Sequence, residues 1–106
     1  KLIKEDVKID AIFSESDSML SGVRGAMQRF KQDPASIIMV GCDYTSEAQT
    51  EIRKGNQTAS VKFPLGGEQA LFYAIDLLEG KSLEKHIFIP VELVTKNNVE
   101  KVTPIF

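Results

Sequence analysis

Three short polar segments, each directly after an apolar run, hold the side chains best placed to do chemistry. The segments are residues 14–18, 41–46 and 62–65. The residues that we single out in them are Ser16, Asp17, Asp43, Lys62 and Phe63. Hydroxyl, carboxylate and ammonium groups donate or accept hydrogen bonds, so they suit contacts with a polar ligand.

The sequence carries no enzyme signature. It has no glycine-rich phosphate loop, no histidine pair at metal-ligand spacing and no nucleophile elbow. His86 is the one histidine, so a histidine-based catalytic triad has no basis. Cys42 is the one cysteine, which excludes a disulfide framework and a structural zinc cluster within the chain. We therefore expect a protein that is not an enzyme and uses no metal and no cofactor.

Helix capping explains some of the polar residues without any ligand. For Asp17 capping is the favoured role, and for Ser16 capping and ligand contact remain equally open. Asp43 is harder to explain in this way, because the Thr and Ser that follow it already supply a cap. The alternatives in the third segment are a solvated strand-end charge at Lys62 and a core position for Phe63.

Apolar runs and helical periodicities alternate along the chain. Strands are predicted at residues 8–13, 37–40, 58–63, 87–89 and 91–94. Helices are predicted from about residue 18 to Asp33–Pro34, over residues 47–54 with Gly55 at the C′ position, and over residues 68–79. Residues 2–4 are typical of the end of a helix.

The alternating order predicts a parallel sheet with helices on its faces. In such sheets ligands bind beyond the carboxyl ends of the strands. The three polar segments follow three different strands, so we expect them to converge on one rim although they lie far apart in the sequence.

Length and charge further limit the classes of protein to which the chain can belong. The chain has 106 residues, enough for one small domain and not for two. A net charge of -2, with Lys and Arg spread along the chain, argues against a surface for nucleic acid or an anionic membrane. No apolar run approaches the roughly 18 residues of a membrane span.

Five segments in order resemble the type I periplasmic sugar-binding proteins, the ribose-binding group. Residues 9–19, IDAIFSESDSM, are similar to the family's DAVFAxNDxM segment, and residues 38–43, IMVGCD, to its VVGFD strand and loop. Residues 52–61, IRKGNQTASV, resemble IxxGxxxATI. The remaining two matches are AIDLLEGK at residues 74–81 and PVELVTKNNV at residues 90–99, similar to a late helix and the terminal strand.

The resemblance implies a fold and a place within it. The fold is a three-layer αβα parallel sheet of the type I periplasmic-binding-protein class. Residues 1–106 would be its carboxy-terminal portion, crossing to the other lobe near Pro64 and returning near Pro90. Residues 65–90 would then pack with an amino-terminal lobe that is missing here. Two lobes of about 100–150 residues each imply a protein about 2.5 times longer, and the abrupt start at Lys1 would only mark where the piece begins.

The resemblance also implies site residues. Ser16 stands where the ribose group usually has a sugar-binding Asn, and Asp43 where it has a sugar-binding Asp. The family's third group, a Gln, corresponds to Phe63 or, with a shift of one residue, to Lys62. Only Asp43 is retained, so ribose itself is not carried over. One side of a cleft should bind sugar weakly or not at all by itself.

Two biological settings fit this resemblance. The first is the solute-binding component of an ABC transporter, which binds a monosaccharide-like sugar and meets a membrane permease in the periplasm. The second is a ligand-sensing domain, either extracytoplasmic in a membrane sensor histidine kinase or cytoplasmic in a repressor of the lactose-repressor family. The missing flanking segments would discriminate between them.

A phosphate-accepting receiver domain is the remaining alternative. Asp17, Asp43 and Lys62 imitate part of the acidic and basic set that a receiver needs. The acidic pair is not directly at the strand end, however, and the spacing from Asp43 to Lys62 is short. We therefore expect no receiver activity.

Overall fold

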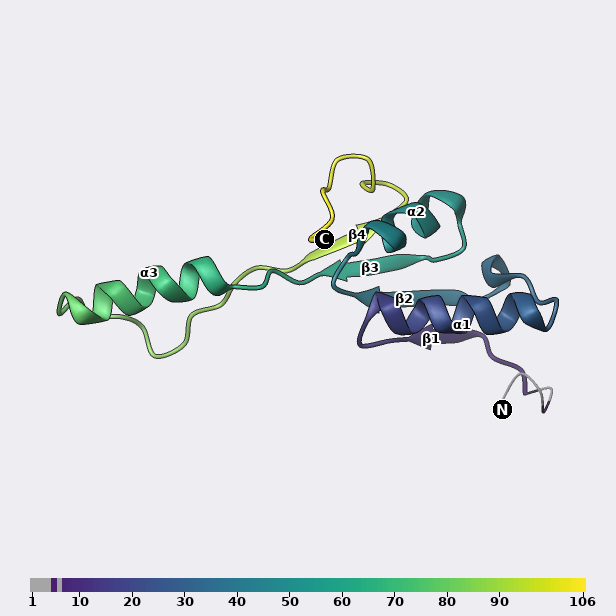
Figure 1. Ribbon diagram of the computed structural model, residues 1–106, viewed down its shortest axis with the longest axis horizontal. Helices are drawn as coiled ribbons and strands as arrows, with labels where there is room; N and C mark the ends of the chain where they lie inside the picture. Colours follow the sequence, from purple (N-terminus) through teal and green to yellow (C-terminus); the bar gives the residue numbers. More distant parts are fainter. Residues whose placement is uncertain (1–4, 6) are drawn as a thin grey trace.

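The computed structural model describes residue 5 and residues 7–106 (Figure 1). The helix end expected at residues 2–4 lies outside this range. Four strands are present: β1 (Ala11–Phe13), β2 (Ile38–Cys42), β3 (Ala59–Lys62) and β4 (Glu92–Thr95). The helices are α1 (Asp17–Arg29), α2 (Ser46–Lys54) and α3 (Gly67–Leu78), with a short 3₁₀ turn, η2 (Pro34–Ser36). None of the helices in the described part combines the length and apolarity that a membrane crossing requires.

The sheet has the order β1-β2-β3-β4, and its first three strands are parallel as predicted. The fourth strand contradicts the prediction, because β4 runs antiparallel to β3. The register explains why. The chain leaves the sheet after Lys62 and re-enters at Glu92, its direct partner across the two strands. A chain that returns to the edge it left must run in the opposite direction.

Both α1 and α2 cover the same face of the sheet. Leu20 and Met27 of α1 pack with Met39 of β2, and Ile52 of α2 packs in a second cluster with Val94 of β4. Met39 and Val94 belong to one face by the strand register. The described residues thus supply the sheet and one helical layer.

The opposite face of the sheet is largely uncovered within the described residues. Phe13, Ile38 and Leu93 point to this face by strand alternation, and their side chains are 70%, 55% and 56% exposed. Apolar runs of this kind are typical of strands that are buried on both faces. The third layer of the predicted αβα fold would lie here.

The helix boundaries follow local chemistry. Helix α1 ends at Arg29, earlier than the prediction at Asp33–Pro34. Lys31 adopts a positive φ of 57°, and Gln32 N–H donates to the carbonyl of Met27 at 2.9 Å. This is a Schellman motif, which ends the helix before proline can. In contrast, Gly55 closes α2 in the left-handed conformation, with φ 86°, as predicted.

An arm formed by residues 63–91 extends away from the sheet (Figure 1). It gives the molecule dimensions of 60 × 29 × 18 Å. Helix α3 was predicted over nearly the same residues, but none of its side chains is buried. The strand predicted at residues 87–89 is wrong: this segment is irregular and pairs with no strand in the described part of the chain.

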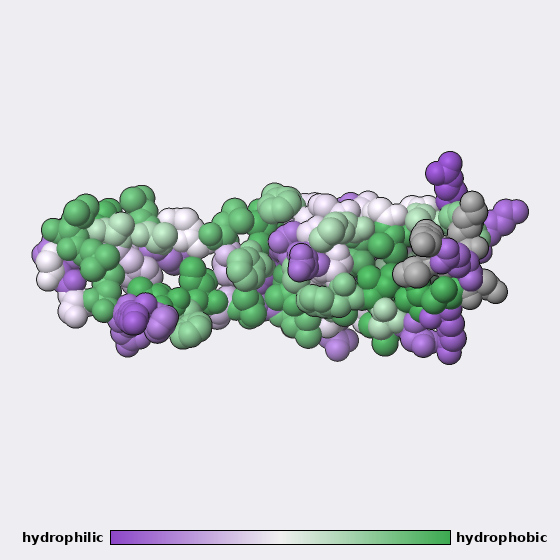
Figure 2. Space-filling view, turned by 90° about the horizontal axis from the view of Figure 1, so that it is seen from below, coloured by the Kyte–Doolittle hydropathy of each residue, from purple (hydrophilic) through white to green (hydrophobic). Residues whose placement is uncertain are grey.

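The two linkers of the arm lie side by side. Residues 63–66 and 87–89 line one cavity of about 290 Å³. Gly66 has φ 70°, a conformation that side-chain-bearing residues rarely adopt, and a Cβ there would come within 2.9 Å of Ile89 Cδ1, so glycine is favoured at this position. Hydrophobic surface covers both the arm and the part of the molecule that holds the sheet (Figure 2). The large exposed apolar residues of the arm include Leu65, Leu71, Phe72, Leu77, Leu78 and Phe88.

Candidate functional site

The carboxyl ends of β1, β2 and β3 meet at one edge of the sheet, as the sequence predicts. Ser14 N–H, just after β1, donates to the carbonyl of Val40 at 2.9 Å. Asp43 N–H, just after β2, donates to the carbonyl of Val61 at 2.9 Å. These bonds extend the strand pairing by one residue on each side. They bring the first and third polar segments next to the second.

Asp43 is held in an unusual backbone conformation. Its φ is 93° and that of Tyr44 is 62°, both in the region that side-chain-bearing residues rarely adopt. Two consecutive residues of this kind cost of order 1–3 kcal/mol each. The carboxylate of Asp43 is partly exposed and pairs with none of the described side chains. It is therefore available to a ligand. The capping role is taken by Thr45, whose hydroxyl accepts from Ala48 N–H at 3.1 Å.

Ser16 caps helix α1. Its hydroxyl oxygen accepts from Met19 N–H at 3.2 Å, and its backbone lies in the extended region that N-cap residues adopt. Of the two roles left open by the sequence, the structure therefore shows the cap. A capping hydroxyl keeps its own hydrogen as a donor, so the cap leaves a ligand contact open.

Lys62 and Phe63 lie at the end of β3. Lys62 is half-buried and is paired in the strand register with Glu92. Phe63 is 58% exposed, so the core position offered as its alternative role is wrong for the described residues. It begins the linker to the arm and lines the cavity between the two linkers.

Asp17 has a different role from the one that the sequence favours. It does not cap the helix but is 1% exposed, with its carboxylate turned into the lobe. Oδ2 accepts from Tyr44 N–H at 2.8 Å, Thr45 N–H at 3.3 Å and Ser60 Oγ at 2.7 Å. Oδ1 accepts from Gln57 Nε2 at 2.7 Å. The hydrogen-bond partners lie 27 to 43 residues away in the sequence, so local capping rules could not reveal them.

Arg24 extends this buried network to the surface. Its Nη1 donates to Gln57 Oε1 at 2.6 Å, and its Nη2 donates to Glu47 Oε1 at 2.7 Å. A second carboxylate, that of Glu51, lies 3.8 Å from Nε. Arg24 is 4% exposed, and a buried guanidinium needs such partners. The sequence contained one signal of this role: Arg24 stands at helical spacing between Leu20 and Met27, on the face of α1 that packs against the sheet.

The electrostatics at this edge are negative. Burial raises the pKa of the Cys42 thiol above its ordinary 9.0, and the charges of Asp43, Asp17 and Glu15 raise it further. A raised pKa keeps the thiol protonated and poorly nucleophilic near neutral pH. Cys42 is thus a small packing residue beside the site rather than a reactive group.

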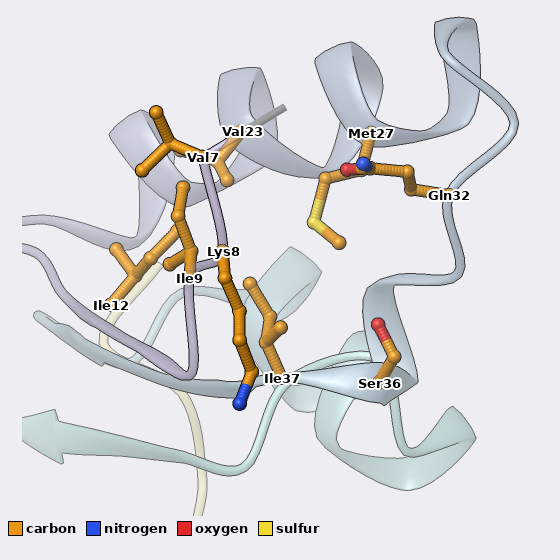
Figure 3. Close-up of a pocket in the computed structure, with 9 residues that line it drawn as sticks. All are labelled: Val7, Lys8, Ile9, Ile12, Val23, Met27, Gln32, Ser36 and Ile37. Atoms are coloured by element: carbon orange, nitrogen blue, oxygen red, sulfur yellow. The ribbon is translucent and has the colours of Figure 1, made fainter. Parts of the chain in front are cut away.

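A cavity of about 380 Å³ lies at the other end of the sheet (Figure 3). Val23 and Met27 of α1 line one side, and Ile37 with the segment that leads into β1 lines the other. It opens at the amino ends of the strands, away from Asp43. It is therefore not the site that the sequence predicts.

The chain has detectable relatives among sugar-binding proteins, although no protein-family model matches it. It is 30% identical over 95 residues to the putative rhizopine-binding protein of Rhizobium meliloti, covering 88% of this chain and 31% of that protein. It is also 30% identical over 97 residues to the ribose import binding protein of Bacillus subtilis, covering 90% of this chain and 31% of the relative. The chain thus spans about a third of the length of these relatives.

Solved structures show the same fold. The myo-inositol binding protein of Caulobacter matches 96% of this chain and 36% of its own length, with a TM-score of 0.81 and 26% identity. The fructose-binding periplasmic domain of a hybrid two-component system matches 93% of this chain and 34% of its own, with a TM-score of 0.83 and 22% identity. The fold is that of the type I periplasmic binding proteins.

The chain is homologous to the type I periplasmic sugar-binding proteins and corresponds to about a third of such a protein. This confirms the resemblance read from the five sequence segments. The relatives carry the names of binding proteins rather than enzymes, in agreement with the prediction that the chain is not catalytic.

Proposed function

We propose that the edge formed by the ends of β1, β2 and β3 is one wall of an interlobe cleft that binds a small polyhydroxylated ligand, a sugar or a cyclitol. The observation that carries this proposal is Asp43. Its carboxylate stands partly exposed and unpaired among the described residues, on a turn held in a costly conformation. Such strain persists where surrounding structure enforces it, and it gathers at ligand sites.

The chemistry of the edge suits a polyol. A carboxylate accepts hydrogen bonds from two adjacent hydroxyl groups, and a charged acceptor strengthens them. Ser16 adds a hydroxyl donor and Lys62 an ammonium donor. Phe63 offers an exposed ring whose face can cover the apolar side of a sugar or an inositol. The names of the relatives and neighbours, which include ribose, fructose and myo-inositol, support this ligand class.

The arm supports a two-lobe arrangement. Residues 65–90 expose apolar side chains that find no partner in the described chain, and α3 buries none of its residues. Exposed apolar surface of this extent marks an interface. We infer that the arm packs with an amino-terminal lobe, that the chain is the carboxy-terminal portion of the whole protein, and that ligand binding needs both lobes.

The setting that the relatives support best is a solute-binding component of an ABC transporter outside the cytoplasm, working with a membrane permease. A sensor domain is the second candidate, because the fructose-binding domain of a two-component system has the same fold. Sequencing the segments on either side of this chain separates the settings: a membrane span and kinase module support the sensor, a helix-turn-helix supports the repressor, and a signal peptide with neither of these supports the transporter.

Isothermal titration of the protein at its full natural length tests the ligand class. We expect saturable heat with at least one of four probes: D-ribose, D-fructose, D-fucose and myo-inositol. Residues 1–106 alone, which hold one wall of the cleft, should give much weaker binding or none. If the full-length protein, folded by circular dichroism, binds none of the four, the polyol proposal is wrong.

A further inference from the structure

The turn that presents Asp43 is held from below by one buried carboxylate. Asp17 Oδ2 accepts hydrogen bonds from the backbone N–H groups of Tyr44 and Thr45, which directly follow Asp43. These are the donors that the positive φ angles of Asp43 and Tyr44 turn inward. Hydrogen bonds to a charged acceptor are stronger than those to a neutral one. Asp17 therefore offsets the cost of the conformation that carries Asp43.

The orientation of Asp17 is itself fixed by two neutral side chains. Ser60 Oγ donates to Oδ2 at 2.7 Å and also accepts from Tyr44 N–H at 3.1 Å. Gln57 Nε2 donates to Oδ1 at 2.7 Å and to the carbonyl of Ala59 at 3.0 Å. Both lie on or beside β3 and are buried. The carboxylate thus joins the start of α1, the β2–α2 turn and β3.

Gly41 in β2 provides the space that the Asp17 carboxylate occupies. Gly41 lies beneath Asp17, and a Cβ at this position would overlap Oδ1 of Asp17 and come within 3.1 Å of Leu20 Cδ1. Glycine at this place in β2 is therefore required by the close approach of Asp17 rather than by backbone freedom. The strand, the carboxylate and the turn form one fitted unit.

We propose that Asp17, oriented by Gln57 and Ser60, is the positioning residue of the ligand site: it holds the Asp43–Tyr44 turn so that the Asp43 carboxylate faces the cleft. Asp17 itself does not touch the ligand, because its oxygens are used within the lobe. The consequence for ligand affinity rests on the proposed function, whereas the effect on the turn does not.

Amide hydrogen exchange, resolved by residue in the full-length protein, tests the effect on the turn. In Asp17→Asn one oxygen becomes a donor, so we expect Tyr44 N–H to exchange about tenfold faster or more. Thr58 N–H, which donates to the carbonyl of Met39, should be unaffected. Equal acceleration at both sites, or none at Tyr44, would overturn the positioning role, because global destabilisation moves both amides together.

The effect on ligand affinity is measured by isothermal titration with whichever of the four probes gives the largest heat. Asp17→Asn should weaken its affinity about tenfold, whereas Asp33→Asn, the same change at an exposed cap of η2, should leave it unaltered. Unchanged affinity in a folded Asp17→Asn protein would overturn the proposal. If no sugar binds the parent protein, the proposed ligand class is wrong. The hydrogen-exchange experiment then still shows whether Asp17 holds the turn. If Asp17→Asn does not fold, Ser60→Ala must show the same local acceleration at Tyr44.

Discussion

The carboxylate Oδ2 of Asp17 lies 2.8 Å from the backbone nitrogen of Tyr44, 27 residues away in the sequence. Through this bond the first turn of α1 supports the loop that follows β2. The loop carries Asp43, a partly exposed carboxylate at the carboxyl edge of the sheet that pairs with no side chain among the described residues. The buried carboxylate of Asp17 holds the turn, and the turn presents the partly exposed carboxylate of Asp43.

Gly41 provides a test of the fit between β2 and Asp17. Gly41→Ala places a methyl group against the buried carboxylate and Leu20, where neither can move freely. We expect the free energy of unfolding to fall by about 1–3 kcal/mol, as measured by urea denaturation of the full-length protein. Gly25→Ala is the matched control. It lies in α1 with no heavy atom within 4 Å of the added Cβ, so it should be neutral or stabilising by up to about 1 kcal/mol. Equal effects of the two changes would contradict the close approach.

Tyr44 anchors the carboxy-terminal segment from the same turn. It is fully buried, and its hydroxyl donates to the carbonyl of Val102 at 3.0 Å, with Val99 O at 3.3 Å. Tyr44→Phe should lower the free energy of unfolding by about 1 kcal/mol. The loss stays modest because Gln49 Nε2 also donates to both carbonyls. A neutral Tyr44→Phe would show that the hydroxyl bonds are not needed.

The carboxylates around Arg24 predict a loss of stability in acid. A hydrogen bond from Ser21 lowers the pKa of Glu47 below its ordinary 4.5; burial opposes this, and Arg24 lowers it further. Burial raises the pKa of Glu51, but hydrogen bonds from Asn56 and Lys54 outweigh it, so that pKa is also lowered.

A pKa that is lower in the folded than in the unfolded state stabilises the fold above the unfolded value of 4.5. That contribution is lost as the pH falls through the folded values. The urea midpoint should therefore drop steeply below about pH 4.5, and less steeply in the Glu47→Gln, Glu51→Gln double variant. Glu15→Gln, at an exposed position outside the arm, is the control. If the urea midpoint of the double variant falls just as steeply below about pH 4.5, Glu47 and Glu51 are not the cause of the fall.

Cys42 reports on the charge of the site. Burial and the neighbouring carboxylates of Asp43, Asp17 and Glu15 raise its pKa. At about pH 8 the native thiol should react with iodoacetamide more slowly than the thiol of the urea-unfolded protein. Asp43→Asn should speed the native reaction, because it removes one of the charges, whereas Asp33→Asn should not. A native rate as fast as the unfolded one would contradict the raised pKa.

Much of the architecture is encoded locally and could be predicted. The apolar runs before residues 14, 41 and 62 gave three adjacent parallel strands, so the convergence of Asp43 and Lys62 on one edge follows from topology alone. Gly55 and Thr45 also act as predicted, since a C′ glycine and an N-cap need only their own helix.

Other features depend on contacts that no local pattern contains. The role of Asp17 requires hydrogen-bond donors in the turn before α2 and on β3. The burial of Tyr44 requires the carboxy-terminal segment. The direction of β4 depends on the arm returning to the edge that it left. The predicted strand at residues 87–89 has apolar residues but no neighbouring strand to pair with, so its backbone remains irregular within the described chain.

Titration of Asp43→Asn with the best-binding probe sugar tests the central claim most directly. Asn tolerates a positive φ as Asp does, and the Asp43 side chain supports no other described group, so the fold should be unaffected. Replacing the charged acceptor should cost about 1.5–3 kcal/mol of binding free energy, which is about a ten- to hundredfold weaker affinity, at an unchanged melting temperature. An unchanged affinity in the folded variant would remove Asp43 from the site and contradict the proposed ligand edge.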